Sequence, residues 1–215
     1  MQPTVKISKS VLLCLIWISI PSLLLSEFKL AYVTDFSLYN CTCIRSLSVC
    51  GRIDPGECDC NAFSFSVLHR STSDSVLNEK CITVWYTSPG NVALLLNNSE
   101  VRHLSLVKCD STGWKPILYD YFTVQRLERL TVSYRNRYAD FTKAIELGRQ
   151  RLPGAHDDEA SMAVIHLSVL AGQPTLKAFT VQTTGHSNGS FPFPNLSMAH
   201  SYLSDTSNKF ITFVY

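Results

Sequence analysis

Cysteine is the residue type whose spacing carries the most chemical information in this chain. Five of the eight cysteines lie within a short segment: Cys41, Cys43, Cys50, Cys58 and Cys60. Clustered thiolates can bind zinc, but zinc sites usually place two or more residues between paired ligands. Here each of the two C-x-C pairs has one intervening residue, and no histidine lies between them. The segment therefore predicts disulfides, with no metal ion and no cofactor.

Disulfides need an oxidising compartment, and the N-terminus indicates one. Lys6 and Lys9 form a basic head, an apolar stretch follows, and Ser26 is a small residue suited to cleavage. Pro21 interrupts the apolar stretch, which is also shorter than the roughly 20 residues that span a bilayer. We expect residues 1–26 to be a secretory signal that is removed, which leaves a secreted chain without a membrane span.

Cleavage of this signal changes the charge of the chain. The full sequence has 19 basic and 17 acidic residues, and Lys6 and Lys9 leave with the signal, so the mature chain carries no net charge. Proteins that bind nucleic acid concentrate lysine and arginine on one face. The densest basic stretch, residues 126–151, is interrupted by acidic residues and is interpreted as a solvated surface with local ion pairs. We expect no nucleic-acid partner.

Cleavage also changes the cysteine count. Cys14 leaves with the signal, and seven cysteines remain. An odd thiol in a secreted chain is either free and buried or paired with another chain. Cys81 is the candidate, because it opens the apolar run 81–86, in which a free cysteine can act as a small hydrophobe. Cys109 joins the five clustered cysteines as a candidate for a disulfide, and the pairing of the six stays open.

Four N-x-Ser/Thr sequences are candidate acceptors for N-linked glycans, at Asn40, Asn97, Asn188 and Asn195. They agree with the secretory route, and each would lie on the surface if glycosylated. Asn40 directly precedes Cys41, so its glycan would lie beside the cysteine-rich segment.

Two further motifs suggest enzymatic chemistry, but their context does not support it. Residues 185–189 fit G-x-S-x-G, which in hydrolases presents a serine, here Ser187, on a turn between strand and helix. A Phe-Pro segment follows where the helix should begin, and no histidine comes after Ser187 and Asp205 to complete the expected order. The acidic run at residues 156–159, His-Asp-Asp-Glu, could suggest a metal site but is interpreted as a solvated loop. The chain is therefore predicted not to be an enzyme.

The elements that must position these residues are mostly strands. Alternating apolar and polar residues predict strands over residues 63–67 and 82–86, and the apolar residues within 209–215 predict a final strand buried on both faces. The strongest helix signal covers residues 140–147, with Gly148 as its cap. We expect a mostly β fold with one or two helices (α+β) and an N-terminal disulfide-rich cap.

A weak repeat leaves two architectures open. Residues 101–109 have the spacing of a leucine-rich repeat, and similar patterns begin at Leu127 and Leu176. A short leucine-rich-repeat-like stack would use the cysteine-rich segment as its N-terminal cap. The alternative is a compact β-rich domain with long loops. The expected organisation is a signal peptide over residues 1–26, a cysteine-rich segment over residues 27–61 and a β-rich domain over residues 62–215, packed together as one globular unit.

The cysteine pattern also resembles that of a known family, the exosomal polycystin-1-interacting protein family of small secreted vertebrate glycoproteins. The resemblance covers most of the mature chain, is most specific in the two C-x-C pairs, and is poor over residues 119–160. The segments that carry it are Asn40-Cys-Thr-Cys43, Cys50, Cys58-Asp-Cys60, Ile82-Thr-Val-Trp-Tyr86, Leu104-Ser-Leu106, Cys109 and Thr212-Phe-Val-Tyr215.

This resemblance implies a non-catalytic binding protein. It implies that the chain binds the extracellular region of polycystin-1, travels in intracellular vesicles, leaves the cell on extracellular exosomes and assists exocytic export of cellular cargo. Two alternatives belong to other functional classes. One is a secreted hydrolase that uses Ser187, and the other is a disulfide-linked extracellular structural protein built through Cys81.

Overall fold

The computed structural model describes residues 27–64, 77–109, 121–136, 139–147, 160–171, 176–184 and 208–215. The strands within these residues are β1 (Phe28–Val33), β2 (Leu38–Cys43), β3 (Cys58–Ala62), β4 (Asn78–Tyr86), β5 (Ser99–Lys108), β6 (Tyr121–Gln125), β7 (Arg129–Asn136), β8 (Ala139–Glu146), β9 (Ala160–His166), β10 (Ala178–Thr184) and β11 (Asn208–Val214). The helices described are α3 (Pro89–Leu96) and α4 (Ser168–Ala171). The expectation of a mostly β chain with one or two helices is confirmed.

Several of the sequence motifs lie outside the described residues. These are the signal segment 1–26, the acidic run 156–159, the G-x-S-x-G motif with Ser187, and the acceptors Asn188 and Asn195. Of the strand expected over residues 63–67, the first two residues follow the end of β3 and the others are not described.

The helix expected over residues 140–147 is wrong, because this segment forms strand β8. β8 pairs antiparallel with β7 along its whole length, with Phe141 opposite Tyr134 and Ile145 opposite Leu130. Phe141 and Ile145 share one face in a strand as well as in a helix, so their spacing fits both periods. The spacing of these residues does not distinguish a helix from a strand, and pairing with β7 decides in favour of the strand.

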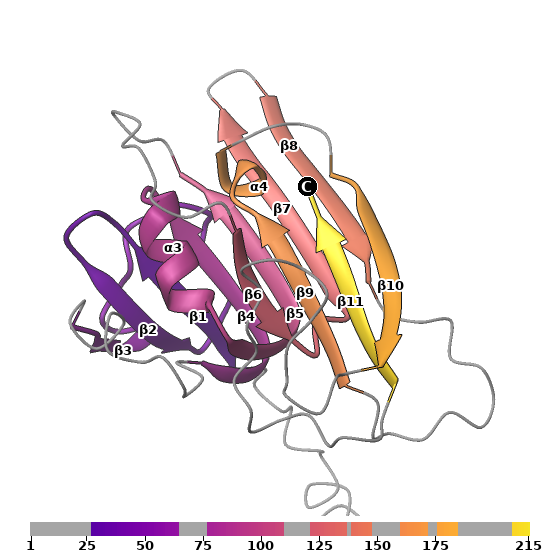
Figure 1. Ribbon diagram of the computed structural model, residues 1–215. Coiled ribbons are helices and arrows are strands. Elements are labelled where there is room, and N and C mark those ends of the chain that lie inside the picture. The colour runs from indigo at the N-terminus through magenta and orange to yellow at the C-terminus, as the bar shows by residue number, and fades with distance from the viewer. Residues whose placement is uncertain are drawn as a thin grey trace, which may run out of the picture.

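Helix α3 (Pro89–Leu96) was not predicted from the sequence. Ser88 has extended backbone angles at the N-cap position, and Pro89 lies in the first turn, where a missing N–H costs no hydrogen bond. Four apolar side chains of α3 are buried, namely Val92, Ala93, Leu95 and Leu96. α3 lies between β4 and β5 in the chain (Figure 1) and contacts β6 and β4.

Two neighbouring strands of the sheet carry the weak leucine repeat noted in the sequence. β5 and β7 pair in parallel, with Leu104 opposite Leu130 and Leu106 opposite Val132, so the repeated leucine positions share a register. The third pattern, from Leu176, runs into β10 at the far end of the sheet, where β10 pairs with β11 alone among the described strands and is antiparallel to it. The described strands therefore do not continue the stack.

The sheet branches where β6 meets β7. Arg126, between these strands, has a φ of 56°, and β5 pairs with β6 at its first two residues and with β7 from His103 onward. β6 continues to β9, β11 and β10, whereas β7 continues to β8. The main core contains residues of both branches, including Leu130 and Val132 of one and Phe122 and Ile165 of the other. The two branches therefore pack on a shared core.

A row of long side chains joins the two branches. Tyr86, Lys108 and Tyr134 are register neighbours on β4, β5 and β7. They donate to three consecutive carbonyls of α4: Tyr86 Oη to Leu170 (3.1 Å), Lys108 Nζ to Ala171 (2.7 Å) and Tyr134 Oη to Val169 (2.7 Å). A helix of four residues cannot satisfy its own last carbonyls, so this row caps α4 and holds it over the core.

The final strand is confirmed. β11 lies between β10 and β9, and Ile211, Thr212 and Val214 are buried. Ile211 and Thr212 belong to opposite faces of the strand, so both faces are covered, as the sequence predicted.

Candidate interaction surface

The structure pairs the six candidate cysteines in three disulfides. Cys41–Cys60 and Cys43–Cys58 join residues that lie directly opposite each other on β2 and β3. Their Cα atoms are 4.0 and 4.1 Å apart, closer than the roughly 4.5 Å of a non-hydrogen-bonded pair in an antiparallel ladder. Cys50–Cys109 ties the loop between β2 and β3, residues 44–57, to the end of β5.

The tied loop covers a second, small core on the face of the sheet that points away from the main core. Trp85 of β4 and Val107 of β5 are buried there beside the cystines, and Leu47 and Ile53 of the loop pack against them. A cluster of this size cannot order a 14-residue loop through apolar burial alone, and covalent links are the usual solution. The small core and its three disulfides form the cystine cap.

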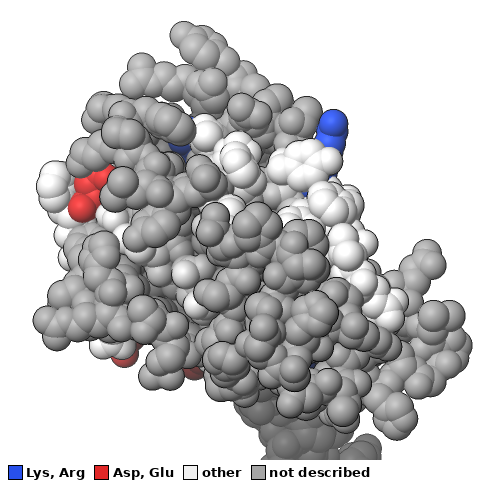
Figure 2. Space-filling model, viewed as in Figure 1, with Lys and Arg blue, Asp and Glu red and all other residues white. Residues whose placement is uncertain are grey.

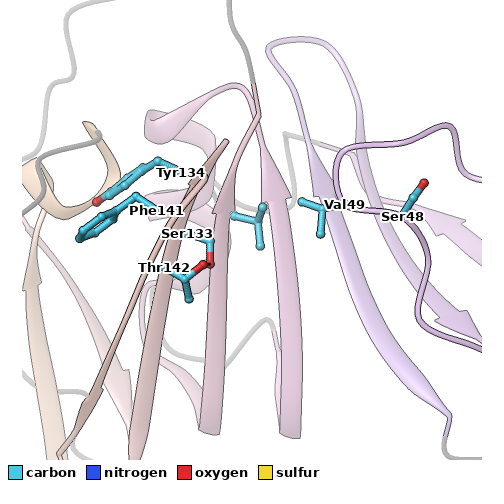
Figure 3. A pocket seen from close by; sticks show the side chains of 7 residues that line it. Ser48, Val49, Ser133, Tyr134, Phe141 and Thr142 are labelled. Atoms are coloured by element: carbon cyan, nitrogen blue, oxygen red, sulfur yellow. Dashed lines mark hydrogen bonds between the residues drawn. The ribbon is translucent and has the colours of Figure 1, made fainter. Parts of the chain in front are cut away.

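A pocket of about 300 Å³ lies where the cystine cap ends. Its lining consists of Ser48, Val49, Val107, Ser133, Tyr134, Phe141 and Thr142. Figure 3 shows the hydroxyls of Ser133 and Thr142 turned toward each other, 3.0 Å apart, and the rings of Tyr134 and Phe141 pointing away from Ser48 and Val49. The residues that line this pocket offer hydroxyls and apolar surface for contact, and no nucleophile beside a base.

The two tyrosines that donate hydrogen bonds to α4 near this pocket have raised pKa values. Burial raises the pKa of Tyr134 to about 12. Burial, and secondarily the neighbouring Tyr134, raises the pKa of Tyr86 well above its usual value. Both hydroxyls therefore remain protonated donors throughout the physiological pH range.

Cys81 is a free cysteine, and it is exposed. The expectation that it acts as a small buried hydrophobe is wrong, because the strand turns its alternate residues inward from Ile82, which is buried, and leaves Cys81 on the other face. Cys81 lies opposite His103 of β5 in the parallel register. The His103 Nε2 atom is 3.6 Å from a carboxylate oxygen of Glu128.

The two described glycan acceptors differ in their surroundings. Asn97 is exposed at the C-cap of α3, and its Oδ1 accepts hydrogen bonds from the backbone N–H and the hydroxyl of Thr123 (3.1 and 3.2 Å). Asn40 is half-buried on β2, and its Oδ1 is a buried atom without a hydrogen-bond partner. Asn97 therefore has the open position that a glycan requires.

The basic stretch forms local ion pairs where the structure describes it. Arg126 lies 2.7 Å from a carboxylate oxygen of Glu100, and Arg129 lies 2.7 Å from one of Glu146. These pairs place opposite charges side by side on the surface, as interpreted from the sequence. Within the described ranges, no group of three or more metal-ligating residues occurs, and no helix there combines the length and apolarity needed to cross a membrane.

An exposed aromatic group lies at the other end of the sheet. Phe179 of β10 and Tyr215 are each half-exposed. The ring of Phe179 stacks on that of Phe213 at 4.9 Å between centroids and meets the ring of Tyr215 edge-on at 6.4 Å. Sequence reasoning missed this group, although the aromatic residues of the C-terminus and the uncharged run 178–184 were visible in the sequence. The pocket has no comparable signal, because distant segments build it.

Comparison with known proteins identifies the family. The family model described as exosomal polycystin 1 interacting protein matches residues 10–215, nearly the whole chain, and the chain belongs to this family. The resemblance found in the cysteine pattern is thereby confirmed. No curated protein and no solved structure matches the chain.

Proposed function

We propose that this member of the family is a secreted, non-catalytic glycoprotein that binds the extracellular region of polycystin-1. The observation that carries the proposal is the family match over residues 10–215, since the family is named for this interaction and for exosomes. In the same proposal the chain travels in intracellular vesicles and on extracellular exosomes and assists exocytic export of cellular cargo.

The proposal includes an organisation of the chain into a cleaved signal over residues 1–26, a cysteine-rich segment over residues 27–61 and a β-rich domain over residues 62–215. Packing within the described residues supports the last two as one globular unit. The small core shares Trp85 and Val107 of the β-rich part with the cystines of the cysteine-rich part, and Cys50–Cys109 links the two parts covalently.

Disulfides and an open acceptor support the secretory route. Three disulfides persist in oxidising compartments and are rare in reducing ones, and the exposed Asn97 side chain suits a glycan. The described pocket is lined by hydroxyls and apolar side chains, with no nucleophile beside a base. Such a lining suits contact with a protein partner.

A capture experiment with purified components tests the proposal. The mature chain, purified from culture medium with its disulfides intact, should retain purified extracellular fragments of polycystin-1 on a column. A reduced and alkylated sample of the same chain is the matched control, and it should retain much less, because the cystine cap depends on the disulfides. Failure of the oxidised chain to retain any fragment would contradict the partner assignment.

A second candidate function rests on the exposed thiol of Cys81. An exposed free cysteine in an oxidising compartment can bond to another chain, which would make the protein a disulfide-linked extracellular structural protein. Non-reducing electrophoresis of the secreted protein separates the candidates. A ladder of linked species that Cys81→Ser abolishes supports the structural protein, whereas monomer alone removes it.

A further inference from the structure

Three strands form the ends of the described sheet, and two of them carry features that protect an edge. β3 is five residues long, carries Asp59 and is tied to β2 by two disulfides. β8 carries Lys143 and Glu146. Short length and charged side chains discourage pairing with other chains. The remaining end strand, β10, has seven residues without a proline or a charge.

The hydrogen bonds show which groups of β10 point outward. Lys177 and Tyr215, just beyond the ends of the two strands, exchange both of their backbone hydrogen bonds (2.8 and 3.0 Å). In an antiparallel ladder such pairs alternate, so Phe179 and Val181 also bond to β11. The N–H and C=O groups of the alternate residues Ala178, Thr180 and Gln182 therefore face away from it. Among the described residues, no strand pairs with these groups.

The side chains along this edge are open and uncharged. Thr180 and Gln182 are exposed, and Phe179 is half-exposed on the opposite face. Figure 1 places β10 at the rim of the sheet, and in Figure 2 a strip of white, uncharged residues runs along this rim below a blue side chain at its upper end. An uncharged edge with outward backbone groups beside an exposed aromatic group is a template for one more strand.

We propose that β10 pairs with β10 of a second copy of the chain, antiparallel about a two-fold axis at Thr180, so that two sheets join into one. In this register Thr180 lies opposite its own copy, Ala178 lies opposite Gln182, and all three outward residues find backbone partners. Phe179 lies opposite Val181 of the copy on the aromatic face. The inference goes beyond the proposed function and does not depend on polycystin-1.

The occupant is a second copy because β10 is complementary to itself. A two-fold axis uses the same patch on both chains, so the patch must carry no like charges across the axis, and β10 carries none. The apolar pair formed by Phe179 and Val181 then occurs twice. A register centred on Val181 would instead place Phe179 opposite Thr183, which buries less apolar surface.

Sedimentation velocity of the mature glycosylated chain over a range of concentrations tests the inference. The wild type should shift from monomer toward dimer as concentration rises. Thr180→Pro removes an outward N–H, together with the hydroxyl that lies 2.9 Å from that of Thr212, and should shift this equilibrium to monomer by at least tenfold. The matched control is Ala144→Pro, because Ala144 is exposed on β8 and its N–H points away from β7; it should dimerise like the wild type.

A charge exchange tests the axis itself. Thr180→Lys and Thr180→Glu should each be monomeric, because like charges directly opposite each other destabilise a strand pair, and an equimolar mixture of the two should restore the dimer. Hydrogen exchange of the wild type should show the Thr180 and Gln182 amides protected only at high concentration. A wild type that stays monomeric, a dimer that Thr180→Pro leaves intact, or a mixture that fails to restore it would overturn the inference.

Discussion

The cystine cap and the C-terminal arm, formed by β9, β10 and β11, lie at opposite ends of one sheet and are held by different forces. The cap orders a 14-residue loop over a small core with three disulfides. The arm has no cysteine in its described residues and relies on strand pairing and on the main core, which includes Ile165 and Val214. The contrast indicates that covalent links occur where apolar burial is too small to order the chain.

Reduction of the disulfides is expected to have the largest effect, and only on the cap. Loss of a native disulfide typically costs about 2–5 kcal/mol, so reduction should release residues 44–57 and expose Trp85. Tryptophan fluorescence should shift to longer wavelength. Amides of β9 and β11 should keep their protection from hydrogen exchange, and loss of that protection in parallel with the fluorescence change would contradict the separation of the two regions.

A core substitution tests the C-terminal arm in the same way, because it removes apolar packing from the arm and leaves the disulfides in place. Ile165 is fully buried in the main core, and Ile165→Ala should lower the free energy of unfolding by about 2–5 kcal/mol, measured by urea denaturation. The disulfides should remain oxidised in a thiol assay. A decrease below about 1 kcal/mol would show that the arm does not depend on the shared core.

Alkaline pH should weaken the link between the two branches of the sheet. Burial raises the pKa of Tyr134 to about 12 and that of Tyr86 well above its usual value, so folding favours the protonated hydroxyls. Their contribution to stability is complete below the unfolded-state pKa of about 10. The contribution of Tyr134 is lost as the pH rises through its folded-state pKa of about 12, and that of Tyr86 declines as the pH rises above 10. Unfolding titrations across this range should show a smaller pH dependence for Tyr134→Phe than for the wild type.

Cys81→Ser is expected to have the smallest effect. The residue is exposed and unbonded, so the free energy of unfolding should change by less than about 0.5 kcal/mol. Cys109→Ser is the matched comparison in the same part of the sheet, because Cys109 is buried and bonded to Cys50. Equal destabilisation by the two substitutions would contradict the assignment of Cys81 as the free thiol.

Sequence reasoning predicted the features that depend on local pattern. The mostly β fold and the C-terminal strand follow from alternation, and the weak repeat places Leu104 and Leu130 at equivalent positions, which the structure pairs in register. β8 was mistaken for a helix because Phe141 and Ile145 fit both periods, and only pairing with β7 separates them. The pocket between the cap and β7 depends on Cys50–Cys109, a link across 59 residues, and no local pattern encodes it.

The oxidised state of six cysteines is the claim on which both the cap and the proposed function depend. Disulfide mapping by mass spectrometry of the secreted chain tests it most directly. The structure predicts the pairs Cys41–Cys60, Cys43–Cys58 and Cys50–Cys109, with Cys81 outside all three. Detection of Cys50 or Cys109 as a free thiol, or of Cys81 bonded to any of the six, would contradict the account.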